Sequence, residues 1–174
     1  RIGETSLTIE DLPGAYSLDP ISPDEQIVHD VLTGTSTTVS APDALVVVVD
    51  ATTLRRGLNF VAEALALELP TCLVVTMTDE LSRRTGRLNV AALGQALGIP
   101  AVRVIGHRGV GMPDLRAQLA QVENWQRTPL LPPTDPDEIT SWADSVLAAA
   151  DYQAPHGLHG PHPCDLVRCS LLPP

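Results

Sequence analysis

Two long runs of apolar, mostly β-branched residues constrain the fold of this chain more than any other feature. They are ALVVVVDA at residues 44–51 and TCLVVTMTD at residues 71–79. Neither run alternates apolar with polar residues, which is typical of strands that are buried on both faces of a parallel sheet. The apolar residues of the segment between them, 58–69, have helical spacing. This succession of strand, helix and strand predicts an α/β fold.

Flanking segments extend the same pattern. Residues 5–11, TSLTIED, alternate polar and apolar residues and predict a half-buried strand that ends on Asp11. SPDE at residues 22–25 is a capping box, which predicts the start of a helix. The apolar stripe of that helix would be Ile27, Val28, Val31 and Leu32. The later pattern predicts a helix at 89–98, a strand at 101–106 and a helix at 111–122. We therefore expect a mostly parallel sheet with helices on both faces.

The chain divides into four parts by composition. Residues 1–126 hold the predicted sheet, and the proline-rich residues 127–135 form a linker. Residues 136–153 have the apolar spacing of one amphipathic helix. Residues 154–174 have no periodicity and are rich in Pro, Gly and His. We expect this last part to be an irregular tail, either disordered or not native to the fold.

Charge and composition exclude several classes of function. The net charge is −10, and all 11 basic residues are Arg, so the chain lacks the clustered positive charge that nucleic-acid binding requires. The absence of Lys excludes Schiff-base chemistry. Three cysteines without framework spacing favour a reducing compartment. The sequence also has no run of 18 apolar residues, which predicts that this chain has no membrane span.

The ends of the predicted strands carry the residues most suited to chemistry, because open parallel sheets bind ligands there. They are residues 11–14, 76–79 and 106–111. An Asp after a strand can hold Mg²⁺ through water, and a Gly three residues later lets a backbone N–H approach a phosphate. An Asp on a later strand end can accept two N–H bonds from guanine, which adenine does not offer. Each element alone is also explained by turn formation; their order along the chain favours a nucleotide site.

The run DLPGAYSLDPISPDEQIVHDVL, residues 11–32, resembles the switch-II segment of the GTPase domain of the bacterial ferrous-iron transport protein B (FeoB) family. The likeness continues through residues 43–80 and 97–116, and SWADSVLAAA at 141–150 resembles the helix that leaves this domain. It covers roughly residues 1–152. The resemblance implies a P-loop GTPase-like fold in which residues 1–126 are a partial G domain that lacks the first strand and the phosphate loop, and 136–153 lead toward a helical domain.

The resemblance also implies GTP or GDP and Mg²⁺ as ligands. Asp11 would hold Mg²⁺ through water, and the N–H of Gly14 would face the γ-phosphate. Asp79 would bind the guanine N1 and N2 hydrogens, and backbone N–H groups at Gly106 and His107 would contact guanine O6. The full set of implied nucleotide-contacting residues is Asp11, Leu12, Pro13, Gly14, Thr76, Met77, Thr78, Asp79, Gly106, His107 and Arg108.

The sequence departs from the family pattern at several points. No G-x-x-x-x-G-K-[ST] phosphate loop and no switch I occur in this chain; in the family they lie upstream of the matching region. Thr76 replaces the usual Asn of the guanine motif. Ala15 stands where many GTPases place a Gln that orients water. We therefore expect slow GTP hydrolysis in the intact parent, and no activity from this chain alone.

The leading interpretation is a partial guanine-nucleotide-binding domain of a ferrous-iron transporter. In the intact parent it would act at the cytoplasmic face of the bacterial inner membrane and control Fe²⁺ uptake through its membrane portion. One alternative is a degenerate interaction module that no longer binds nucleotide. Another is metal binding by the tail, whose Pro and Gly residues argue against a preorganised site. The residues of that tail site would be His156, His159, His162, Cys164 and Cys169.

Overall fold

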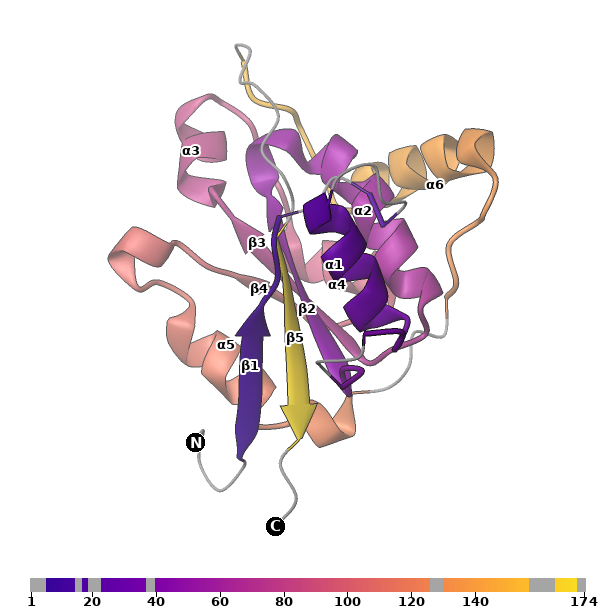
Figure 1. Ribbon diagram of the computed structural model, residues 1–174. Helices are drawn as coiled ribbons and strands as arrows, with labels where there is room; N and C mark the ends of the chain where they lie inside the picture. Colours follow the sequence, from indigo (N-terminus) through magenta and orange to yellow (C-terminus); the bar gives the residue numbers. More distant parts are fainter. Residues whose placement is uncertain are drawn as a thin grey trace.

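The computed structural model describes residues 6–14, 17–18, 23–36, 40–125, 130–156 and 165–171 of the chain. Its described strands form a five-stranded sheet of order β1-β5-β2-β3-β4 (Figure 1). The strands are β1 (Leu7–Asp11), β2 (Ala44–Asp50), β3 (Thr71–Thr76), β4 (Ala101–Arg103) and β5 (Asp165–Leu171). The helices are α1 (Pro23–Leu32), α2 (Leu54–Ala66), α3 (Thr78–Arg83), α4 (Val90–Leu97), α5 (Met112–Leu119) and α6 (Pro136–Ala149). Three short 3-10 turns are η1 (Ala51–Thr53), η2 (Gly106–Arg108) and η3 (Val122–Asn124).

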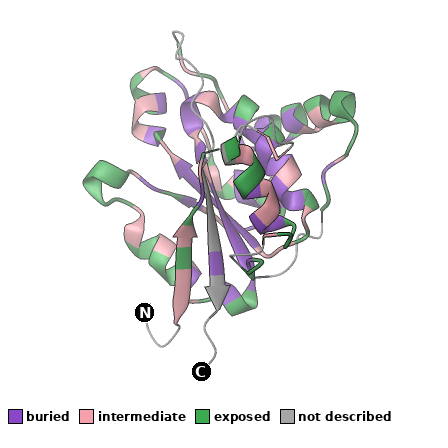
Figure 2. Ribbon diagram, in the orientation of Figure 1, coloured by how far each residue is buried: buried purple, intermediate pink, exposed green. Residues whose placement is uncertain are grey.

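The centre of the sheet is parallel, as the two apolar runs predict. Strand β2 pairs with β3 from Leu45 opposite Thr71 to Asp50 opposite Thr76. Strand β3 in turn pairs with β4 in parallel. Nearly every residue of β2 and β3 is buried (Figure 2). Continuous burial on both faces explains why these strands have no polar alternation.

Helices cover both faces of the sheet, and each face has its own apolar core. One core joins Leu45, Val47 and Leu73 to the buried faces of α1, α2, α4 and α6. The other joins the alternate residues Val46 and Val74 to residues of α5 and η3. In Figure 1, α1, α2, α4 and α6 lie on one side of the sheet and α5 on the other. The predicted two-sided architecture is confirmed.

Local signals define where several helices begin and end. The Asn89 side chain accepts a hydrogen bond from the N–H of Ala92 and caps α4, which ends at Gly98 with a φ of 70°. Asp135 caps α6 in the same way, and Pro136 occupies its first turn. A side-chain acceptor at the N-cap satisfies an N–H that has no partner within the helix, and Pro has no N–H to leave unpaired.

Several sequence-based boundaries are wrong. β3 ends at Thr76, because Met77 takes a left-handed conformation with a φ of 57° and α3, which was not predicted, follows at once. α2 begins at Leu54 and not at residue 58. β4 ends at Arg103, and α5 spans only Met112–Leu119. Ile27, expected in the apolar stripe of α1, is 51% exposed, and Ser22 of the predicted capping box lies outside the described residues.

The C-terminal part departs most from its prediction. Residues 154–174 were expected to be irregular, but Asp165–Leu171 forms β5, inserted between β1 and β2 and antiparallel to both. Cys169 pairs with Ile9 on one side and with Ala44 on the other, and only 1% of it is exposed. Two neighbouring strands supply partners for its backbone, which periodicity within the segment does not reveal. Residues 157–164 lie outside the described part of the chain.

No helix within the described ranges is both long and apolar enough to cross a membrane.

Candidate functional site

The candidate site lies along one edge of the sheet. β1 and β2 are both antiparallel to β5, so they run parallel to each other and to β3. The carboxyl ends of β1, β2 and β3, at Asp11, Asp50 and Thr76, therefore share this edge. Three strand spacings separate β1 from β3, roughly 14 Å. The edge brings residues 11–14 and 76–79 onto one side of the molecule without direct contact between them.

The loop after β1 is anchored by Leu12. Leu12 is 9% exposed and belongs to the larger apolar core, whereas Asp11 and Gly14 on either side are exposed and Pro13 is intermediate. This alternation holds the loop against the core and leaves the Asp11 carboxylate and the Gly14 backbone accessible at the edge. Ala15, the predicted replacement for a water-orienting Gln, lies outside the described residues.

The chain beyond this loop is held by side chains of two helices. Glu63 of α2 accepts hydrogen bonds from the Ser17 hydroxyl, at 3.0 and 3.1 Å, and from the N–H of Leu18. The Nδ1 atom of His29, on α1, lies 3.2 Å from the carbonyl oxygen of Leu18. The segment predicted to be switch II is thus attached to α2 through one carboxylate and to α1 through one imidazole.

The end of β3 is shaped by Met77. Thr76 donates its hydroxyl to the carbonyl of Val49 at 3.0 Å, so this side chain joins β3 to β2. Met77 then turns the chain through its left-handed conformation, and its side chain is left 45% exposed. Thr78 is buried, and its hydroxyl has no hydrogen-bond partner within the described residues. Asp79 follows in the first turn of α3.

Asp79 opens into a cavity of about 500 Å³, lined also by Ser82, Arg83, His107 and Arg108. The Nε2 atom of His107 lies 3.9 Å from Oδ2 of Asp79, and 21% of the Asp79 side chain is exposed. The structure therefore brings the predicted residues Asp79, His107 and Arg108 together. Sequence reasoning missed Ser82 and Arg83, although their positions three and four residues after Asp79 place them on the same helical face.

The loop that carries His107 is fixed by its backbone. The N–H of Ile105 donates to the carbonyl of Val110 at 3.0 Å and closes the loop around η2. Gly111 has a φ of 80°, and a Cβ atom at this position would lie 1.8 Å from the carbonyl oxygen of Arg103. Only glycine fits there, and Gly109, with a φ of 65°, meets the same conformational requirement. Gly106 opens η2 and is exposed, with its backbone at the rim of the loop.

Other charged groups near this edge are already paired. Glu80 forms ion pairs with Arg83 and, at 2.7 Å, with Arg84. Asp50 accepts hydrogen bonds from the N–H of Thr52 at 2.7 Å and from its hydroxyl at 2.6 Å, which caps η1. Asp11 and Asp79 are therefore the two strand-end carboxylates best placed to meet a ligand.

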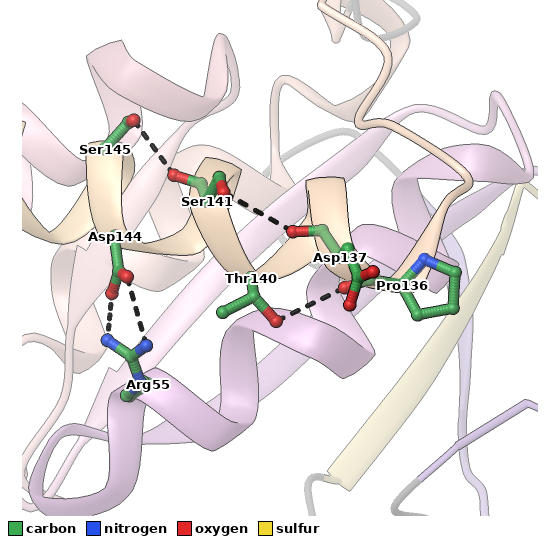
Figure 3. Close-up of polar contacts among 7 residues, drawn as sticks. All are labelled: Arg55, Pro136, Asp137, Thr140, Ser141, Asp144 and Ser145. Carbon is green, nitrogen blue, oxygen red and sulfur yellow. Dashed lines mark hydrogen bonds and ion pairs between the residues drawn. The ribbon is translucent and has the colours of Figure 1, made fainter.

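A larger cavity, of about 680 Å³, lies where η1 and α2 meet α6. Arg55 and Asp144 form a two-pronged ion pair across the two helices (Figure 3). The hydrogen bond with Asp144 raises the pKa of the Arg55 guanidinium, whose side chain is 57% exposed. The Tyr152 hydroxyl donates to the carbonyl of Ala51 at 3.1 Å. The ion pair joins α6 to α2, and the Tyr152 hydroxyl joins the chain just after α6 to η1.

The proposed metal-binding tail finds no support in the described residues. His156 lies 2.6 Å from the Thr85 hydroxyl through its Nδ1 atom, and Cys169 is buried in the sheet. His159, His162 and Cys164 lie outside the described part. The described ranges contain no group of three or more His, Cys, Asp and Glu side chains that could hold a metal ion.

Comparison with known proteins shows which family this chain resembles. The sequence model of ferrous iron transport protein B matches residues 1–119. The Fe(2+) transporter FeoB of Salmonella typhimurium is 33% identical over 153 residues, which cover 85% of this chain and 18% of that protein. A Fe(2+) transport protein A/FeoB fusion protein of Porphyromonas gingivalis is 35% identical over 115 residues, covering 66% of this chain and 13% of the fusion. The chain thus spans less than a fifth of these relatives.

Solved structures agree with the fold. The cytosolic domain of L. pneumophila FeoB aligns with a TM-score of 0.62 and 26% identity, covering 72% of this chain and 48% of that chain. A mutant of S. thermophilus NFeoB bound to GDP aligns with a TM-score of 0.58 and 28% identity over 72% of this chain and 46% of that one. The GMPPNP form of the T. maritima cytosolic domain, at 19% identity and a TM-score of 0.66 over 80% and 78% of the two chains, supports the fold alone. This chain belongs to the ferrous iron transport protein B family.

Proposed function

We propose that this chain is the guanine-nucleotide-binding part of a ferrous-iron transporter, with residues 1–126 as a partial G domain and α6 as its exit helix. The observation that carries this proposal is the shared sheet edge, which has the Asp79 cavity at one end and the loop 11–14 at the other. The two strands that lead into these sites, β3 and β1, are roughly 14 Å apart, and such a spacing suits the base and the phosphates of one extended ligand. A solved relative bound to GDP supports the same ligand class.

Base recognition would rest on Asp79. Its carboxylate can accept the N1 and N2 hydrogens of guanine, while His107, which lines the same cavity, and the neighbouring Gly106 can donate their backbone N–H groups to guanine O6. The N–H of Arg108 already donates to the carbonyl of Ile105 at 3.0 Å. Adenine has no hydrogen at N1 and carries an amino group in place of O6, so its base would leave both sets of groups unpaired. A site built to hydrogen-bond one ligand discriminates strongly against an analogue without those groups.

The phosphate end would rest on the loop 11–14. The exposed Asp11 carboxylate suits a hard cation, and Mg²⁺ is usually held by one or two carboxylates together with water and phosphate oxygens. The residues present thus fit Mg²⁺ held through water, and the ion would neutralise phosphate charge. Gly14, with no side chain, leaves its N–H open to a phosphate oxygen. The chain has no G-x-x-x-x-G-K-[ST] sequence, so this end would contribute little affinity and no hydrolysis.

In the longer transporter, nucleotide binding would regulate Fe²⁺ uptake by moving the segment that begins at Asp11. The Glu63 contacts with Ser17 and Leu18 connect this segment to α2, and the Arg55–Asp144 pair connects α2 to α6. α6 would then lead toward the membrane portion, and the G domain would act at the cytoplasmic face of the bacterial inner membrane. A nucleotide switch requires contacts that differ between the nucleotide-bound and the nucleotide-free state.

A competition titration tests base recognition in this chain. A fluorescent guanosine nucleotide is bound in the presence of Mg²⁺, and GTP, guanosine and ATP are compared as competitors. We expect GTP and guanosine to displace the probe at least about tenfold more effectively than ATP. Asp79→Asn should remove this preference, while Asp114→Asn, at an exposed site on α5, should not. Equal displacement by ATP, or an unchanged preference in Asp79→Asn, would contradict the assignment.

A further inference from the structure

Guanine has one more hydrogen-bonding edge atom than the contacts of the proposed base site would satisfy. Its N1 and N2 hydrogens would go to Asp79, and O6 would accept from the backbone N–H groups of Gly106 and His107. N7 lies beside O6 on the same edge of the base and is a further acceptor. If N7 loses its hydrogen bond to water on binding and gains none from the protein, affinity falls. A donor for N7 should therefore lie close to Asp79 and η2.

The hydroxyl groups at this end of the sheet are poor candidates for that donor. The Thr76 hydroxyl has one hydrogen, which it donates to the carbonyl of Val49 at 3.0 Å. The Ser82 hydroxyl donates its hydrogen to the carbonyl of Thr78 at 2.9 Å. The hydroxyl of Thr78 itself is enclosed by protein atoms and does not line the Asp79 cavity of about 500 Å³. Arg83, which does line that cavity, is held in an ion pair within α3.

Arg108 is the residue of this cavity whose side chain is uncommitted. It lines the cavity together with Asp79, and within the described part of the chain its guanidinium makes no hydrogen bond or ion pair. Its backbone is nevertheless fixed, because its N–H donates to the carbonyl of Ile105 at 3.0 Å. The neighbouring imidazole of His107 lies beside Asp79, with 3.9 Å between Nε2 and Oδ2. A guanidinium carries several N–H donors in a planar fork, and its charge strengthens each hydrogen bond.

We propose that the Arg108 side chain is a specificity-determining contact of the base site, donating to N7 and sharing O6 of guanine. This inference rests on the proposed function, in which Asp79 binds the opposite edge of the base. The same two-pronged pair is the commonest specific contact of proteins with guanine in DNA. Adenine keeps N7 but has an amino group in place of O6, so one prong would meet another donor. The site would thus require guanine with a free N7, and 7-methylguanine derivatives would be excluded.

Guanosine and 7-deazaguanosine, which has a C–H in place of N7, isolate this contact from the rest of the site. Both compete with a fluorescent guanosine nucleotide bound to the full chain in the presence of Mg²⁺. In the unmodified chain we expect 7-deazaguanosine to displace the probe at least about fivefold less effectively than guanosine. Arg108→Met keeps an apolar stem but no donor, and it should reduce this ratio to less than about twofold. Arg116→Met, at an exposed position of α5 outside the cavity, removes the same charge and should keep the ratio.

Two results would overturn the proposal. Equal displacement by guanosine and 7-deazaguanosine in the unmodified chain would mean that no group of the site donates to N7. A ratio that survives in Arg108→Met, or that is lost in Thr76→Val instead, would assign the donor to another residue. GTP and ATP are compared in the same assay. A preference for GTP without any effect of N7 would refute this inference alone, whereas no preference for GTP would refute the proposed function as well.

Discussion

The Nε2 atom of His107 lies 3.9 Å from Oδ2 of Asp79, so the side chain of one guanine-loop residue faces the carboxylate proposed to bind the base. His107 is 67% exposed, and ion pairs between exposed groups contribute about 0–1 kcal/mol. The proposed contact of this loop with guanine O6 uses backbone N–H groups, so it does not depend on the His107 side chain. The backbone of this loop would therefore contact the ligand, whereas the His107 side chain lies beside Asp79.

His107→Ala is therefore expected to change guanine-nucleotide affinity by less than about fivefold. The substitution keeps the backbone N–H and removes only an exposed imidazole beside Asp79. Competition binding of GTP at pH 8, compared with Asp79→Asn in the same assay, checks this expectation. A loss as large as that of Asp79→Asn would mean that the imidazole itself holds the ligand.

Gly111→Ala is expected to be far more disruptive than His107→Ala. The new Cβ would meet the carbonyl oxygen of Arg103 at 1.8 Å, and the φ of 80° is itself unfavourable for alanine. The backbone at the end of β4 must shift to relieve this contact, at a cost of about 2 kcal/mol or more. Urea unfolding measures that loss of stability. Gly106→Ala is the control, because no atom lies within 4 Å of its Cβ position; equal effects of the two would contradict the argument.

Glu63→Ala should loosen the segment that follows the loop 11–14. It removes the acceptor of the Ser17 hydroxyl and of the Leu18 N–H, and hydrogen bonds to a charged group contribute about 1.5–3 kcal/mol. We expect faster amide exchange at Leu18 and a smaller loss of global stability. Glu138→Ala, at an exposed position of α6, controls for the loss of one negative charge. Unchanged exchange at Leu18 would show that Glu63 does not hold this segment.

The parallel centre of the sheet and the meeting of Asp79 with His107 and Arg108 could be predicted because their signals are local or follow from topology. Continuous burial leaves β2 and β3 without polar alternation, and parallel strands must end on one edge, which places residues 76–79 and 106–108 together. α3 was missed because it is only six residues long and follows a left-handed Met77, which no periodicity reveals. Its side chains Ser82 and Arg83 were missed for the same reason.

β5 could not be predicted because the position that it fills in the sheet, and not its own sequence, makes this segment a strand. DLVRCSL follows a stretch rich in Pro, Gly and His, and nothing in it distinguishes a strand from a tail. The gap between β1 and β2 becomes visible only when the two strands are placed in the sheet. A vacant position between two strands offers backbone partners on both sides, and this overrides weak local preference.

The buried thiols should make the fold less stable above pH 9. Burial raises the pKa of Cys72 to about 12 and that of Cys169 to about 11, from an ordinary value of 9.0. Between pH 9 and about 11 the unfolded chain loses these protons and the folded chain keeps them. The free energy of unfolding therefore falls as pH rises through this window, whereas below pH 9 the contribution of the thiols is constant. Tyr152, whose pKa is raised chiefly by burial, acts in the same direction.

Urea unfolding at pH 8 and pH 10.5 measures this effect. Cys72→Ala and Cys169→Ala each leave a small cavity that weakens the fold at both pH values, so the informative quantity is the difference between the two pH values. We expect the loss of stability between pH 8 and pH 10.5 to be smaller in each variant than in the unmodified chain. The reduction should be roughly 1.4 kcal/mol for each pH unit by which the higher pH exceeds the pKa of the thiol in the unfolded chain. Val46→Ala, which removes buried atoms from the same apolar core without removing a thiol, is the control and should keep the full difference. If all three variants lose stability equally between the two pH values, the buried thiols do not cause the decline.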